Sequence, residues 1–153
     1  MEVKTFTSRQ VVGITTRTNN HLEQTEGEGQ IIQLWQTFNQ NYVPLLHEGT
    51  TLYGIYSHYE SDHHGDFNAT VASDSSELIV QADNDPSLQI LQLDGGRYLS
   101  FAAQGEMPQT VIRLWELVWR YFEQSDCPYQ RAYCQDIEIY HHSDEVEIAI
   151  SIL

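Results

Sequence analysis

Basic side chains are scarce in this sequence of 153 residues. Seven Lys and Arg residues stand against 22 Asp and Glu residues, which gives a formal net charge of −15 at pH 7. Direct DNA binding depends on basic side chains that neutralise phosphates, so we expect no direct nucleic-acid binding. The acidic excess is compatible with plain solubility and also with a preference for cationic ligands.

Long apolar runs are also absent. No run approaches the roughly 18 apolar residues that suggest a membrane-spanning helix, and the opening "MEVKTFTSRQ" has no apolar core of the signal-peptide kind. We therefore expect a cytoplasmic protein with no membrane partner. The length fits one domain with its own buried core, spanning residues 1–153.

Cysteine is nearly absent, since the chain has only Cys127 and Cys134. Two thiolates are too few for a closed structural zinc site unless histidine completes it, and a reducing cytoplasm favours free thiols. The sequence also has no Ser-His-Asp order, no phosphate-cradling glycine loop and no CxxC pair. We accordingly predict no cofactor.

Two short clusters of histidines occur in predicted hairpin turns. The first contains His58, His63 and His64, and the second contains His141 and His142. A metal site needs three or four convergent ligands, and adjacent side chains in a turn tend to diverge. We interpret these histidines as solvated turn residues and predict no metal site.

Two helices are predicted from apolar spacing. Ile31, Leu34, Trp35 and Phe38 fall on one face of the first, and Val111, Leu114, Trp115, Val118 and Phe122 fall on one face of the second. The two cores, "IIQLW" and "VIRLW", are closely similar. This similarity indicates an internal repeat.

The repeat extends beyond the helices. Each helix follows strand-like sequence and precedes an Ile-Tyr strand, a polar turn and a second alternating strand. Tyr56 then matches Tyr140, and Gly54 matches Glu138. We predict an α+β fold of tandem β-α-β-β halves, with pseudo-twofold symmetry and an antiparallel sheet carrying both helices on one face. The halves are about 1–74 and 86–153, joined by a linker loop, "SDSSELIVQADNDP".

Glu138 is unusual because it lies between Ile137 and Ile139 in the strand-like "DIEIY". Carboxylates are depleted in strands and costly when buried without a partner. Alternation predicts an apolar face under the helices, carrying Ile137, Ile139, Val146, Ile148, Ile150 and Ile152. The opposite face then carries Glu138 with Asp136, Tyr140, Glu147, Ala149, Ser151, Gly54, Tyr56, Tyr98 and Ser100. Glu138 is either an ordinary residue on a wet face or the receptor for an organic cation held among aromatic rings.

The sequence resembles the GyrI-like small-molecule-binding domains, which are also the effector-binding domains of AraC-type and MerR-type multidrug regulators. The matching segments run over nearly the whole chain: "VVGITTRTNN", "IIQLWQTF", "LYGIYSHYESD", "GGRYLSFAAQG", "VIRLWELVW" and "DIEIY". It looks most like the free-standing, integron-associated effector-binding proteins.

The resemblance implies a pocket between the two halves, with Glu138 as its acidic centre. It also implies aromatic walls from Tyr56 in "YGIY", Trp115 and Trp119 in "LWELVW", and Tyr98 and Phe101 in "GRYLSF". Phe101 falls on the apolar strand face by alternation, and we assign Trp35 to core packing.

The expected function is reversible binding of hydrophobic, cationic organic molecules, without catalysis. The regulators of this kind carry a separate helix-turn-helix domain, for which this chain has no room. We therefore expect a stand-alone sensor for transcription regulation that acts through a protein partner, or a protein that sequesters its ligand. Two alternatives stay open. One is a GyrI-like hydrolase of strained-ring electrophiles, with Glu138 as base and Glu147 or Glu60 as a second carboxyl. The other is an acidic inhibitor of a DNA-processing enzyme such as gyrase.

Overall fold

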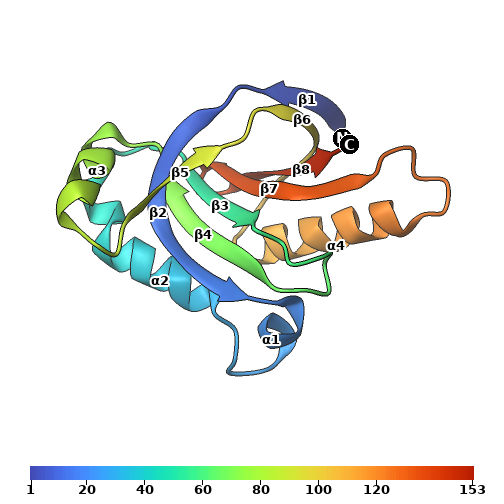
Figure 1. Ribbon diagram of the computed structural model, residues 1–153, viewed down its shortest axis with the longest axis horizontal. Helices are drawn as coiled ribbons and strands as arrows, with labels where there is room; N and C mark the ends of the chain where they lie inside the picture. Colours follow the sequence, from blue (N-terminus) through green and yellow to red (C-terminus); the bar gives the residue numbers. More distant parts are fainter.

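The computed structural model describes residues 1–153 and contains one curled antiparallel sheet of eight strands (Figure 1). Their order across the sheet is β1-β6-β8-β7-β3-β4-β2-β5. The strands are β1 (Glu2–Phe6), β2 (Arg9–Thr18), β3 (Leu52–Ser57), β4 (Phe67–Ser73), β5 (Gln89–Leu93), β6 (Gly96–Gln104), β7 (Arg131–His142) and β8 (Glu145–Ile152). The α+β class and the antiparallel sheet are as predicted.

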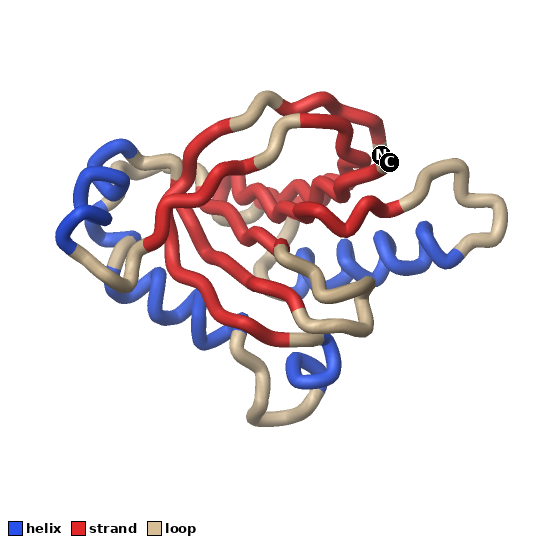
Figure 2. The backbone as a smooth tube through the Cα atoms, in the orientation of Figure 1, coloured by secondary structure: helices blue, strands red, loops and turns tan.

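Four helices lie outside the curl of the strands (Figure 2). They are α1 (Asn20–Gln24), α2 (Ile31–Asn41), α3 (Ser76–Gln81) and α4 (Gln109–Glu123), with 3-10 turns at Val43–Leu45 and Ala82–Asn84. The two predicted helices are α2 and α4. The expected linker loop instead contains α3, which begins where Ser75 accepts the Leu78 amide N–H and which buries Leu78. None of the helices has the length and apolar content to cross a membrane.

The repeat is centred on β3 and β7, which pair in the middle of the sheet. Gly54 lies opposite Glu138 in this pairing, and these two residues also correspond in the repeat. The pseudo-twofold axis therefore passes between them. On one side lie β3, β4 and β2, and on the other lie β7, β8 and β6.

Each half also lends an edge strand to the other half. The first strand, β1, pairs with β6, and β5 pairs with β2. The segment "DGG" at residues 94–96, between β5 and β6, does not form a hairpin turn, because β5 and β6 lie toward opposite ends of the strand order. The two crossings meet, since a Cβ on Gly95 would lie 3.0 Å from the Ser8 amide nitrogen. The two crossings therefore pass close to each other.

The prediction that Ile137 and Ile139 of β7 share a face with Ile148 and Ile150 of β8 is wrong. Glu138 pairs with Ile148, and Ile137 pairs with Ala149. Glu138 therefore shares the helix-covered face with Ile148 and Ile150, whereas Ile137 and Ile139 face the inside of the curl. The cause is a register shift between Tyr140 and His142, because one extra residue in a hairpin reverses the relation between its strands.

The apolar core has three parts. Inside the curl, Ile137, Tyr53 and Tyr98 pack together without any helix residue. On the outer face, α4 places Leu114 and Val118 over β6 and β8. In the other half, α2 places Phe38 over β2 and β4. The two main helices thus cover the same face of the sheet, and this face also carries Glu138.

Candidate ligand-binding site

Glu138 is buried on the helix-covered face, with 3% of its surface exposed. Three neutral donors hold its carboxylate. Tyr56 Oη and Trp115 Nε1 donate to Oε2 at 2.9 and 2.6 Å, and Tyr140 Oη donates to Oε1 at 2.8 Å. A Cβ on Gly54 would lie 2.6 Å from Oε1, so glycine opposite Glu138 leaves the space that the carboxylate occupies.

Protonation in this cluster is governed by burial. Burial raises the pKa of Glu138, and the hydrogen bonds from Trp115, Tyr140 and Tyr56 oppose that rise. Burial and the charge of Glu138 raise the pKa of both tyrosines, so both phenols keep their protons and donate. No Lys, Arg or His side chain pairs with Glu138. The ionised cluster therefore carries a buried negative charge that lacks a counter-cation.

The aromatic rings around Glu138 follow the repeat. Tyr56 packs edge-on against Trp115 with ring centroids 5.5 Å apart, and Tyr140 packs edge-on against Trp35 at 5.1 Å. Of the two tryptophans, only Trp115 donates to the Glu138 carboxylate. The hydrogen bonds to Glu138 therefore do not follow the repeat completely.

A cavity of about 450 Å³ adjoins this cluster. Its apolar lining comes from α2, α4, β3, β4 and the connection after β3, namely Ile31, Tyr56, Tyr59, Phe67, Ile112, Trp115 and Trp119. Its polar lining is Asn20, Glu23, Gln24, His63, Glu116 and Arg131. Glu138 itself is not part of the lining. It lies behind Tyr56 and Trp115, which both line the cavity and donate to its carboxylate.

The structure brings together four of the six residues named from the sequence: Glu138, Tyr56, Trp115 and Trp119. The other two lie elsewhere. Tyr98 faces the inside of the curl, where its ring packs 5.1 Å from Phe6 and its hydroxyl donates to the Asp94 carbonyl. Phe101 is on the helix-covered face but packs in the core against Tyr121 and Phe122, away from the cavity. The prediction that Tyr98 shares a face with Glu138 is therefore wrong.

Several lining residues were not found from the sequence, and Arg131 is the most consequential. Its Nη2 donates to Asp136 Oδ2 at 2.7 Å, and Asp136 is completely buried. Tyr59 Oη and the Ser151 amide N–H also donate to Asp136. Arg131 begins β7 in a stretch without periodicity, so no pattern pointed to it. Tyr140 does not line the cavity but donates to Glu138, and it could have been found because it matches Tyr56 in the repeat.

One acidic lining residue has a structural partner. The carboxylate of Glu23 accepts the backbone N–H groups of Gln30 and Ile31, at 2.8 and 2.7 Å. These are free amides at the start of α2, where a negative charge is favoured. Glu23 therefore ties α1 to α2 and fixes one wall of the cavity.

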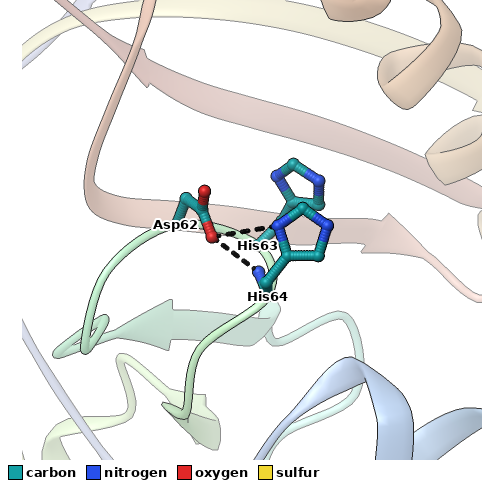
Figure 3. A group of neighbouring side chains, drawn as sticks. All are labelled: Asp62, His63 and His64. Atoms are coloured by element: carbon teal, nitrogen blue, oxygen red, sulfur yellow. Dashed lines mark hydrogen bonds and ion pairs between the residues drawn. The ribbon is translucent and has the colours of Figure 1, made fainter.

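The turn after β3 places His63 and His64 close together, contrary to the expected divergence (Figure 3). Their ring centroids are 4.0 Å apart, and one donor atom each from Asp62, His63 and His64 lies within 4.8 Å of the others. These are the side chains of this region that could hold a metal ion. Burial and the charge of His64 lower the pKa of His63. Both rings are exposed, as expected for solvated turn residues. Cys127 and Cys134 are free thiols.

Comparison with known proteins places these features in context. A family model described as a GyrI-like small molecule binding domain matches residues 1–152. An integron cassette protein from the mobile metagenome of Vibrio cholerae is 35% identical in sequence, with a TM-score of 0.91, over 99% of this chain and 95% of that one. No curated protein sequence matches the chain.

Two further solved structures share the fold at lower identity. The protein SAV2435, solved bound to tetraphenylphosphonium, is 22% identical with a TM-score of 0.73, over 99% of this chain and 93% of that one. A putative bacterial transcription regulation protein from Staphylococcus aureus is 20% identical with a TM-score of 0.72, over 99% and 96% of the two chains.

Proposed function

The chain belongs to the GyrI-like small molecule binding domain family, and on this basis we propose that it reversibly binds hydrophobic organic cations in the cavity beside Glu138. The observation that carries the proposal is the state of this carboxylate. It is buried, it is held by three neutral donors, and it has no cationic partner in the protein.

A cation gains more from this site than a neutral molecule of the same shape. Unit charges about 4 Å apart attract by roughly 4 kcal/mol at an effective dielectric near 20, and a larger separation reduces this. A cation over an aromatic face adds about 0.5–2 kcal/mol. A neutral ligand gains only the apolar contact with Trp119, Ile112 and their neighbours.

Glu138 influences the cavity through the rings of Tyr56 and Trp115. Tyr56 and Trp115 line the cavity and donate to the same carboxylate oxygen. Hydrogen bonding to an anion polarises a donor, which makes both rings more electron-rich and better partners for a cation. The bound tetraphenylphosphonium of SAV2435, an apolar cation on the same fold, supports this class of ligand.

Binding is favoured over hydrolysis by the placement of the carboxyls named for catalysis. Glu147 lies on the opposite face of the sheet, where Lys4 donates to it at 2.8 Å and His141 contacts it at 3.0 Å. Glu60 is exposed and does not line the cavity. Both oxygens of Glu138 already accept hydrogen bonds. The pair of carboxyls that the hydrolase alternative invoked is therefore not assembled.

We further propose that the protein is a stand-alone effector sensor in transcription regulation, with a protein partner as its output. The net charge of −15 argues against direct contact with nucleic acid. The fold shared with a putative transcription regulation protein supports a regulatory setting.

A matched pair of small ligands tests the binding proposal. Methyltriphenylphosphonium is a cation, and triphenylphosphine oxide is a neutral molecule of similar shape. We expect saturable quenching of tryptophan fluorescence by the cation and at least about fivefold weaker binding of the oxide, since one cation–π contact is worth about 1 kcal/mol. Equal affinities for the two would contradict the charge-selective site.

A further inference from the structure

The guanidinium of Arg131 lies over the ring of Tyr133, 4.4 Å from its centroid, but few of its N–H donors are used by the protein. Its side chain is 8% exposed, and its single hydrogen bond runs from Nη2 to Asp136. Its Nε is buried without an acceptor, one of only two such side-chain atoms in the chain. Its Nη1 also makes no hydrogen bond, and unlike Nε this atom is not fully buried, so Nη1 is the donor that a ligand could reach.

Arg131 lies where two cavities adjoin. It lines the cavity beside Trp115 and also a second cavity of about 420 Å³. Asn20, Gln24, His63 and Trp119 line both cavities as well, so the two spaces adjoin. Arg131 thus stands at their junction, where a ligand that extends past Trp119 would meet it.

The other groups at the junction leave room for an oxygen acceptor. A guanidinium has five N–H donors in a planar fork that matches a carboxylate. Asp136, which is also on β7, takes one of these donors. The side-chain carboxylates that line the two cavities are Glu23, Glu116 and Glu123, and none of them pairs with Arg131. Glu23 is engaged by the backbone amides of α2.

We propose that Arg131 forms an acceptor subsite, and that the preferred ligand is an organic zwitterion. Its cationic ring system lies on Trp115 and Tyr56, and its carboxylate lies on Arg131. This rests on the proposed function and narrows its ligand class. The two cavities together offer about the volume that a drug-sized molecule requires.

The net charge of the protein makes the test sharper. A charge of −15 repels a carboxylate at long range, so general electrostatics favour a plain cation over a zwitterion. At physiological ionic strength the screening length is about 8 Å. A preference for the zwitterion under these conditions can only come from a local donor.

Two dyes that differ only in a ligand carboxylate test the subsite. Rhodamine 110 has a free carboxylate, and rhodamine 123 is its methyl ester with the same cationic ring system. Fluorescence anisotropy gives the Kd of each for the wild-type protein at physiological ionic strength. We expect rhodamine 110 to bind about tenfold more tightly, the scale of one hydrogen bond to a charged group.

A charge-neutral double variant assigns the preference to Arg131. Removing Arg131 alone would leave Asp136 buried and unpaired, so we combine Arg131→Gln with Asp136→Asn, which keeps the net charge at −15. The preference for the acid over the ester should fall to about onefold or reverse, and this ratio is the readout because Arg131 lines the cavity and its loss can change the absolute affinity of both dyes. Circular dichroism checks the fold, and the wild-type dye comparison stands even if this variant does not fold.

The outcomes separate the two proposals. If both dyes bind wild-type protein equally, or the ester binds more tightly, the subsite is overturned while cation binding stands. If the acid is preferred but the folded double variant keeps that preference, Arg131 is not its source and the subsite is overturned. If neither dye binds, the proposed function fails and the subsite fails with it.

Discussion

At the scale of the residue, the site depends on a carboxylate and a glycine that face each other across the symmetry axis. Glu138 fits because Gly54, its partner on β3, has no side chain. The repeat gives two tyrosines equivalent positions on either side, and each donates to one oxygen of Glu138. The fold thus holds the Glu138 carboxylate with neutral donors, and in our proposal its cationic partner is the ligand.

Gly54→Ala should disturb this arrangement directly. The new Cβ would lie 2.6 Å from Glu138 Oε1, so the carboxylate must shift and lose hydrogen bonds. We expect a loss of about 1–3 kcal/mol in the free energy of unfolding, measured by urea denaturation. In a Glu138→Ala background the same substitution should cost clearly less. If Gly54→Ala lowers the free energy of unfolding equally in both backgrounds, the new Cβ does not clash with the Glu138 carboxylate.

Cation affinity should fall at acid pH. Burial raises the pKa of Glu138, so protonation removes its charge at a pH above the ordinary value for glutamate of 4.5. A bound cation favours the ionised form, so binding releases a proton wherever free Glu138 is protonated. The Kd of methyltriphenylphosphonium should therefore rise as the pH falls through the pKa of Glu138. The Kd of triphenylphosphine oxide should stay flat, and parallel curves for the two ligands would contradict the assignment.

The residues of the site were predictable where the repeat constrained them. The repeat matched Gly54 with Glu138, and the alternation in β3 placed Tyr56 on the same face as Gly54. Tyr98 was assigned to the wrong face. One extra residue near His141 shifts the register between β7 and β8, and this shift decides which side chains of β8 and β6 share a face with Glu138. Nothing in the hydrophobic pattern reveals such a bulge. Arg131 was missed because its partner Asp136 becomes buried only in the folded sheet.

At the scale of the element, α4 carries two stripes. Val111, Leu114 and Val118 form the buried stripe against the sheet. A second stripe of Ile112, Trp115 and Trp119 has helical spacing and lines the cavity. The sequence pattern assigned Trp115 to the core stripe, because apolar spacing alone does not distinguish a core from a cavity wall.

Two truncations on α4 should separate these stripes. Val118 is fully buried, so Val118→Ala should cost about 2 kcal/mol of stability. Ile112 is 53% exposed and lines the cavity, so Ile112→Ala should change stability by under about 0.5 kcal/mol yet weaken cation binding by roughly twofold or more. Thermal unfolding and ligand titration of both variants check this. A large stability loss in Ile112→Ala with unchanged binding would place it in the core instead.

At the scale of the whole molecule, the halves are interlocked. β1 completes the sheet of the second half, and β5 completes that of the first. The repeat predicted two similar units side by side, and it predicted the central β3–β7 contact only as a possibility. The exchange of edge strands was not predictable, because both crossings look like ordinary hairpin turns in the sequence.

Separated halves should therefore not fold alone. Residues 1–85 lack the partner of β1, and residues 86–153 lack the partner of β5. We expect neither fragment to unfold cooperatively on heating, and an equimolar mixture to recover the circular dichroism of the intact chain. A cooperative transition in one isolated fragment would contradict a single interlocked domain.

The most direct measurement is the Kd of methyltriphenylphosphonium for Glu138→Gln, by calorimetry, beside wild type and Glu147→Gln. The control removes the same charge from a buried carboxylate on the opposite face of the sheet. We predict that Glu138→Gln weakens binding by more than about 1 kcal/mol while the control binds like wild type. Equal affinity in all three proteins would contradict the role of Glu138 as the charge that selects the ligand.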